Sequence, residues 1–178
     1  MLSQSSVPDF AELLSGAQHT AVHLEMRDLY GVGDEADLIE RFARTGEISL
    51  DPTASFWPEW LGIVRETLAR GVIMRRAWIV SEPVTDYIRW EYTSTPLNLE
   101  AGEQVRWLPR RRASDIPLPG NDFWLIDGRR VMFHFFTGDG DWADPGFETT
   151  DDPAAVRLCA SAFETVWERG VPHEKFTV

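Results

Sequence analysis

Two apolar segments separated by Asp127-Gly128 constrain this chain more than any other feature. Residues 122–126 and 130–136 are rich in aromatic and aliphatic side chains. An Asp-Gly pair between two such runs is a strong signal of a two-residue β-hairpin turn. The sequence therefore predicts two antiparallel strands. We expect Asp127 to tolerate a left-handed backbone and to bond locally, so that Asn would replace it almost silently.

Composition favours one well-buried domain. The chain has 178 residues, 43% of them hydrophobic, and eight are tryptophan, so we expect a single domain over residues 1–178. No apolar run approaches the ~18 residues of a membrane span, and residues 1–6 lack the order of a secretion signal. The single cysteine leaves no disulfide framework. These features predict a cytoplasmic protein without membrane contacts.

The net charge of −12 limits the classes of partner. Phosphate backbones repel so acidic a protein, so we expect no direct binding of nucleic acid. Residues 71–112 are the exception, with seven arginines against five acids. This middle segment can still bind a small anion locally.

Helices and strands are interspersed along the chain. Apolar spacing and start and stop residues predict helices at residues 8–15, from Asp34 to Thr45, from Ser55 to Gly71, from Ser81 past Tyr92, and from Asp152 to Gly170. Short apolar runs predict strands at residues 72–80, 105–108, 122–126, 130–136 and near Phe147. Residues 17–30 fit either a strand or a helix. The order favours an α/β domain (α+β is possible) with helices packed on a mixed sheet.

The hairpin resembles half of a phospholipase D-type domain. That family's motif is His-x-Lys-x4-Asp, followed by a glycine and a return strand. Laid on this chain, Asp127 takes the Asp place, whereas Gly120 and Asp122 stand where the catalytic His and the phosphate-binding Lys belong. The resemblance implies a phospholipase D-like half-fold without catalytic residues, because a carboxylate at position 122 would repel phosphate.

A second resemblance covers nearly the whole chain. The segments His23–Tyr30, Arg76–Pro83, Asp86–Glu91, Arg106–Pro109 and Asn121–Asp127 resemble an actinobacterial family called domain of unknown function 6879. Its members are often encoded beside small helix-turn-helix regulators. The resemblance therefore implies such a regulator as a partner protein.

A ligand site is predicted where the strand at 72–80 ends and a helix begins, since ligands bind at the carboxyl ends of strands in open α/β sheets. Free N–H groups there can hold an anion, helped by Arg76 and Arg89. A purely structural reading, in which Glu82 and Asp86 stabilise the helix start, remains open. The candidate ligand-binding residues are Arg76, Ser81, Glu82, Asp86, Tyr87, Arg89, Arg106 and Asp122.

Asp122 needs a partner if it enters an apolar strand. We expect it to pair with Arg76, Arg89 or Arg106, and its replacement by Asn to lower stability by about 1–3 kcal/mol.

Other motifs favour structural roles. His19 and His23 have metal-ligand spacing but no third ligand, and residues 139–150 lack the acid that ends a calcium loop. Cys159 lies on the apolar stripe of the last helix, and the basic residues 110–112 are expected at a solvated loop tip. No metal and no cofactor is predicted.

The sequence supports two main functional hypotheses. The first is a non-catalytic binding or regulatory module that works with a helix-turn-helix regulator, as a ligand sensor or a protein-contact domain. The alternative is a hydrolase or nucleotide-processing enzyme, although no spacing identifies a nucleophile. A dimerisation scaffold is a third possibility. The enzyme hypothesis uses the polar residues Arg76, Glu82, Tyr87, Arg89 and Asp122.

Overall fold

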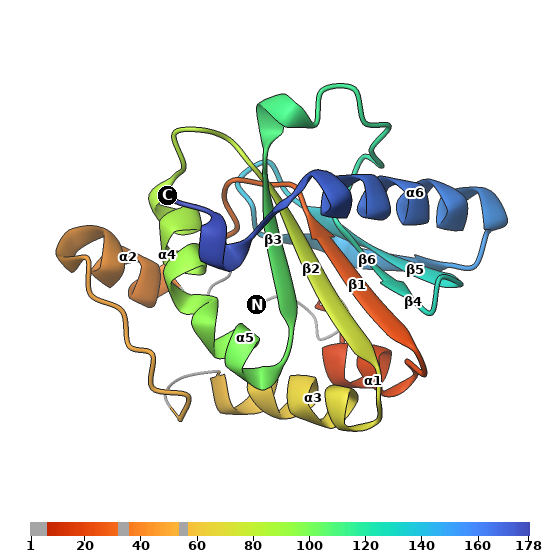
Figure 1. Cartoon of the computed structure of the whole chain (residues 1–178), viewed down its shortest axis with the longest axis horizontal. Coiled ribbons are helices and arrows are strands. Elements are labelled where there is room, and N and C mark those ends of the chain that lie inside the picture. The colour runs from red at the N-terminus through yellow and green to blue at the C-terminus, as the bar shows by residue number, and fades with distance from the viewer. Residues whose placement is uncertain (1–6, 32–35, 54–56) are drawn as a thin grey trace.

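A mixed β-sheet forms the centre of the molecule (Figure 1). The computed structural model describes residues 7–31, 36–53 and 57–178. Within them the sheet has seven strands in the order β6-β5-β4-β1-β2-β3-β7, in which β1, β2 and β3 are parallel and the remaining pairings are antiparallel. The strands are β1 (Thr20–Glu25), β2 (Ile73–Val80), β3 (Gln104–Pro109), β4 (Phe123–Ile126), β5 (Arg130–Phe136), β6 (Trp142–Thr150) and β7 (Val171–Pro172).

Helices cover both faces of the sheet. Helix α6 packs on one face, and α1, α3, α4 and α5 pack on the other, with α2 lying against α4 (Figure 1). The predicted α/β class with a mixed sheet is confirmed. None of the helices in the described part is long and apolar enough to cross a membrane. The helices are α1 (Phe10–Ser15), α2 (Ala36–Thr45), α3 (Trp57–Ala69), α4 (Asp86–Ser94), α5 (Pro96–Ala101) and α6 (Pro153–Arg169).

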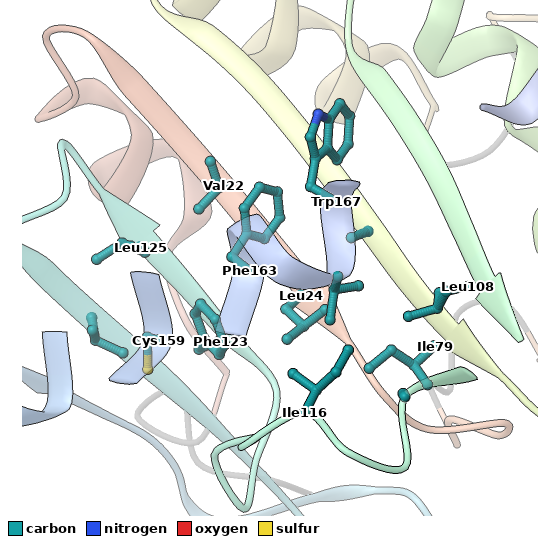
Figure 2. Packing of buried hydrophobic residues seen from close by; sticks show 14 residues of the cluster. Val22, Leu24, Ile79, Leu108, Ile116, Phe123, Leu125, Cys159, Phe163 and Trp167 are labelled. Carbon is teal, nitrogen blue, oxygen red and sulfur yellow. The ribbon is translucent and has the colours of Figure 1, made fainter. Parts of the chain in front are cut away.

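The α6 face of the sheet carries a large cluster of buried apolar residues. Cys159 and Phe163 of α6 are fully buried against Leu24 of β1 and Phe123 of β4 (Figure 2). Asp152 begins the helix, since its carboxylate accepts hydrogen bonds from two backbone N–H groups of the first turn. The predicted helix, its apolar stripe and the core position of Cys159 are confirmed.

The last residues close one edge of the sheet. β7 pairs with β3, and Phe176 stacks on Trp107 with ring centroids 5.8 Å apart. The Tyr92 hydroxyl donates to the Phe176 carbonyl oxygen at 2.7 Å. The opposite edge is β6, the edge strand predicted near Phe147.

Two helix starts differ from the prediction. The segment at Ser81 is a loop, and α4 begins at Asp86, where Thr85 accepts from the Ile88 N–H at 3.1 Å. Ser81 does not start a helix because its N–H and hydroxyl both bind the Asp28 carboxylate. Similarly, α1 is capped by Asp9 and begins at Phe10.

Three further expectations concern the first part of the chain. The ambiguous residues 17–30 contain β1, whose side chains are buried on both faces of the sheet because helices cover both. The expected starts at Asp34 and Ser55 lie outside the described residues. The helix stops are as predicted: Gly46 and Gly71 have φ values of 68° and 86°, which L side chains rarely adopt.

The Asp127-Gly128 turn is confirmed, with φ values of 51° and 62° that fit a type I′ hairpin. The expectation of purely local bonding was wrong. The Asp127 carboxylate accepts from the N–H groups of Gln18, His19 and Thr20 at 3.0, 2.7 and 2.9 Å. Partial burial raises the pKa of Asp127, but these three donors outweigh it and hold the pKa below its ordinary value. Asp127 thus fastens the hairpin turn to the start of β1.

We expect Asp127→Asn to lower the free energy of unfolding by about 1–2 kcal/mol, because the uncharged amide loses charge-assisted bonds and turns an N–H donor toward backbone donors. Urea denaturation at neutral pH measures the loss. Asp139→Asn, at an exposed turn, is the matched control and is expected to change stability little. A silent Asp127→Asn variant would contradict the tethering role.

Candidate functional site

A cavity of about 270 Å³ opens at the carboxyl ends of the parallel strands. β4 runs antiparallel to β1, so β4 starts where β1 ends. The loop that precedes β4 therefore forms the opposite wall of the cavity. Four of the lining residues, Arg27, Arg110, Asn121 and Asp122, bring charged or polar side chains. The lining residues are Met26, Arg27, Arg110, Leu118, Pro119, Gly120, Asn121, Asp122 and Phe136.

Arg110 is held in place by groups at the ends of β1 and β2. Its Nε donates to the Ser81 hydroxyl at 3.0 Å, and one terminal nitrogen donates to the carbonyl oxygens of Met26 and Ile79 at 2.5 and 3.1 Å. The same nitrogen lies 3.3 Å from the Asp28 carboxylate. The expected solvated tip therefore does not include Arg110, although its side chain keeps 41% of its surface exposed at the cavity.

Arg27 supplies the second guanidinium group. Its central carbon lies 5.3 Å from the ring centre of Phe136, and one terminal nitrogen donates to the Thr137 carbonyl oxygen at 3.2 Å. The side chain is half-buried. Arg27 and Arg110 therefore face one cavity from two different strand ends.

Asp122 is a carboxyl group in the same cavity, with 3% of its surface exposed. One oxygen accepts from the Met26 N–H at 2.9 Å and the other from the Tyr30 hydroxyl. Burial raises the pKa of Asp122 to about 6, although these two hydrogen bonds and the charges of Arg27 and Arg110 act in the opposite direction. An ionised Asp122 therefore costs the fold free energy, which is typical of a functional position.

The arginines expected to pair with Asp122 lie elsewhere, so that prediction was wrong. Arg76 binds two other carboxylates, Glu25 and Glu103, on the face of the sheet opposite α6. Arg89 pairs with Asp86 on the exposed surface of α4 at 3.1 Å. Arg106 points to the α6 face, where it donates to the Trp167 carbonyl oxygen at 2.8 Å.

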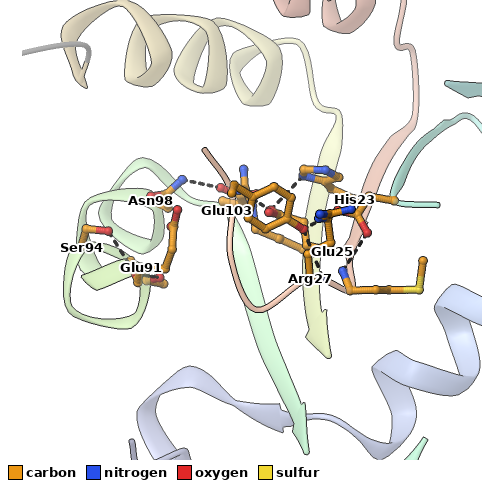
Figure 3. A network of polar contacts seen from close by, with 12 residues as sticks. His23, Glu25, Arg27, Glu91, Ser94, Asn98 and Glu103 are labelled. Carbon is orange, nitrogen blue, oxygen red and sulfur yellow. Dashed lines mark hydrogen bonds and ion pairs between the residues drawn. The ribbon is translucent and has the colours of Figure 1, made fainter. Parts of the chain in front are cut away.

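Arg76 forms ion pairs with two buried carboxylates, Glu25 and Glu103, which Figure 3 labels in a network of polar contacts. Its Nε lies 2.9 Å from Glu103, and a terminal nitrogen lies 2.8 Å from Glu25. The side chains of Glu25 and Glu103 are 9% and 0% exposed. Burial lowers the pKa of Arg76, but these two carboxylates raise it above its ordinary value. Asn98 also donates to Glu103, at 2.7 Å.

Two buried histidines lie beside this network in an aromatic layer. His23 stacks on Trp124 with ring centroids 4.3 Å apart, and His134 lies 5.5 Å from His23. Burial, together with the charge of Arg76, lowers the pKa of His134 to about 3, so the ring is neutral. His23 Nδ1 lies 3.2 Å from a Glu25 carboxylate oxygen but forms no hydrogen bond with it. Across residues 7–31, 36–53 and 57–178, no group of three His, Cys, Asp or Glu side chains is placed to hold a metal ion.

The sequence profile of the family described as "Domain of unknown function (DUF6879)" matches residues 8–178. The chain belongs to this family. No curated protein matches the chain by sequence.

Solved structures show which fold this family member has. Nuc, a phospholipase D family member from Salmonella typhimurium, is similar with a TM-score of 0.52 and 10% identity, over 91% of this chain and 86% of Nuc. TrmBL2, an archaeal chromatin protein whose structure is described as showing a novel mode of DNA binding, has a TM-score of 0.49 and 12% identity, over 90% of this chain and 48% of TrmBL2. The likeness to Nuc confirms the expected phospholipase D-like fold.

The cavity lies beside the predicted site and shares only part of its residues. Of the eight candidate residues, Asp122 lines it and Ser81 supports Arg110. Glu82 pairs with Arg111 at 3.2 Å, outside the cavity, and Tyr87 is buried with its hydroxyl 2.7 Å from Glu91. Arg27 and Arg110 also follow the carboxyl ends of strands, β1 and β3, so the rule that places a ligand site at the end of strand 72–80 identifies both arginines as well.

The buried network generates one stability prediction. Arg76→Met leaves Glu25 and Glu103 buried without their cation, so we expect the free energy of unfolding to fall by about 3–5 kcal/mol. Arg75→Met is the neighbouring control, because Glu164, the partner of Arg75, is 53% exposed; its loss is expected to be about 1 kcal/mol. Denaturant melts compare the two, and equal losses would show that burial of the network does not matter.

Asp122 generates a prediction about the pH dependence of stability. It replaces the earlier expectation that Asp122→Asn lowers stability through the loss of an ion pair with an arginine. A carboxyl whose pKa is raised to about 6 on folding contributes stability that is complete below its ordinary pKa of 3.8 and is lost as pH rises through about 6. Asn cannot titrate. Relative to the native chain, Asp122→Asn should therefore gain about 2 kcal/mol between about pH 4.5 and about pH 7.5. Denaturant melts across this range test it; a constant difference, or a relative loss, refutes the assignment.

Proposed function

We propose that this chain is a non-catalytic binding module that takes a small anionic ligand in the cavity at the ends of β1 and β3. In this proposal it acts as the ligand sensor of a separate helix-turn-helix regulator. The observation that carries the proposal is the convergence of Arg27 and Arg110 on one cavity in a chain of net charge −12.

The cavity has the chemistry of an anion site. A guanidinium group matches carboxylate and phosphate oxygens geometrically, and Arg110 is already fixed by carbonyl oxygens, so little side-chain entropy is lost on binding. Met26, Leu118 and Phe136 add apolar surface for the body of an organic anion. The volume of about 270 Å³ favours a small molecule over a polymer.

The enzyme alternative receives less support from the geometry. The residues that line the cavity within the described part include no His, Cys, Ser or Thr, and both oxygens of Asp122 are already bonded. Of the proposed catalytic residues, Arg76 lies in a buried network and Arg89 on the exposed surface of α4, and neither is bonded to Asp122. Gly120 and Asp122 occupy the cavity at the positions that the phospholipase D motif gives to His and Lys.

The regulator partner is proposed from the family resemblance, and the net charge of −12 supports a module that contributes no base readout of its own. A pull-down from the native host should recover a helix-turn-helix protein. Recovery of none above background would remove this half of the proposal and leave the ligand site standing.

Sulfate is a suitable probe of the ligand site because its charge is constant across the working range of pH. We expect Arg27→Gln to weaken sulfate binding by about tenfold at about pH 5, since one of two charge-assisted contacts is lost. Arg111→Gln is the matched control, because Arg111 is adjacent to Arg110 but 79% exposed and paired with Glu82. Isothermal titration calorimetry measures both. Equal effects of the two variants would place sulfate outside the cavity.

A further inference from the structure

We propose that this cavity is gated by a proton: the anion binds tightly when Asp122 is protonated and weakly when Asp122 is ionised. The inference rests on the proposed function and names the regulation of the same site. The residue concerned is Asp122, for which the sequence predicts an ion pair with an arginine.

The geometry makes Asp122 a competitor of the ligand. Its carboxyl group lines the cavity with Arg27 and Arg110, and 3% of its surface is exposed. In its ionised form it supplies the negative charge that an incoming anion would bring to the same two cations. Two like charges that face the same cavity repel each other more strongly in a partly buried site than in water. An anion and an ionised Asp122 are therefore poor neighbours.

Asp122 can release and take up a proton under mild conditions because burial raises its pKa to about 6. The hydrogen bonds from the Met26 N–H and the Tyr30 hydroxyl stabilise the ionised carboxylate, but they only partly offset the effect of burial on its pKa. Loss of the proton places a full charge on a side chain that is almost entirely buried.

Tyr30 and His134 keep one protonation state while Asp122 titrates. Burial and the nearby carboxylates raise the pKa of Tyr30, so its hydroxyl stays protonated. From β5, His134 is neutral, with a pKa of about 3 set mainly by burial. Asp28 is bonded to Ser81 and Arg110 at the rim. Glu25 on β1 and Glu91 on α4 are buried carboxyls whose pKa burial also raises above its ordinary value.

Linkage then fixes the direction of the effect. If protonation of Asp122 favours the anion, the bound anion must raise the pKa of Asp122 by the same free energy. Sulfate affinity should be highest below about pH 5 and should fall as pH rises through the range around 6 in which Asp122 ionises.

The test is calorimetric titration of sulfate at several pH values between about 5 and 8, at constant ionic strength. We expect the dissociation constant of the native chain to rise roughly tenfold over this range, a typical coupling between two charged sites. Asp122→Asn is expected to bind sulfate at about pH 8 as tightly as the native chain does at about pH 5, without pH dependence. The same pH dependence in Asp122→Asn would overturn the proposal and assign the titration to another group, Glu25 first.

A second variant keeps the test decisive if Asp122→Asn does not fold. The Tyr30 hydroxyl bond favours the ionised form of Asp122, so Tyr30→Phe should move the midpoint of the pH dependence upward. A midpoint that stays in place or moves down would contradict gating by Asp122.

The same data separate the two proposals. Sulfate binding that depends on Arg27 but not on pH leaves the ligand site standing and overturns the gate. Absence of sulfate binding at every pH, or binding indifferent to Arg27→Gln, overturns both.

Discussion

The ion pairs of the Arg76 guanidinium group are the interaction on which the face of the sheet opposite α6 depends. It joins the end of β1, through Glu25, to the residue that precedes β3, through Glu103. Buried ion pairs contribute little net stability, but each carboxylate is costly without its cation. The network therefore acts mainly as a register device: any arrangement of these strands that separates Arg76 from either carboxylate leaves charge unpaired in the core.

The two faces of the sheet differ in the buried side chains that they carry. Against α6 the strands present an apolar surface that includes Leu24, Ile79 and Phe123. On the other face the same strands alternate to His23, Arg76 and Trp78, and polar contacts join the helices to the sheet. The cavity lies at the edge where the polar face meets the ends of β1 and β3. The apolar cluster under α6 thus stabilises the strands that carry the site. The charged groups of the site would not stabilise these strands by themselves.

Local sequence signals predicted much of the fold and little of the site. The hairpin, the last helix and its stripe are encoded by contiguous residues, so periodicity and turn chemistry were sufficient to find them. The partners of Asp122 and Asp127 were not predictable in this way. Asp122 binds Met26 and Tyr30, and Asp127 binds residues 18–20, which lie about a hundred positions earlier in the chain. Such contacts depend on β1 pairing with β4, which no local pattern specifies.

The C-terminal segment is part of the sheet edge rather than an appendage to it. Two residues of β7 and the aromatic contacts of Phe176 are what separate the backbone of β3 from solvent along this side. A chain shortened before residue 171 would carry a bare parallel edge strand, which is a template for pairing with other chains. A tag or fusion partner is therefore best joined at the exposed residue Val178, with residues 171–176 left intact.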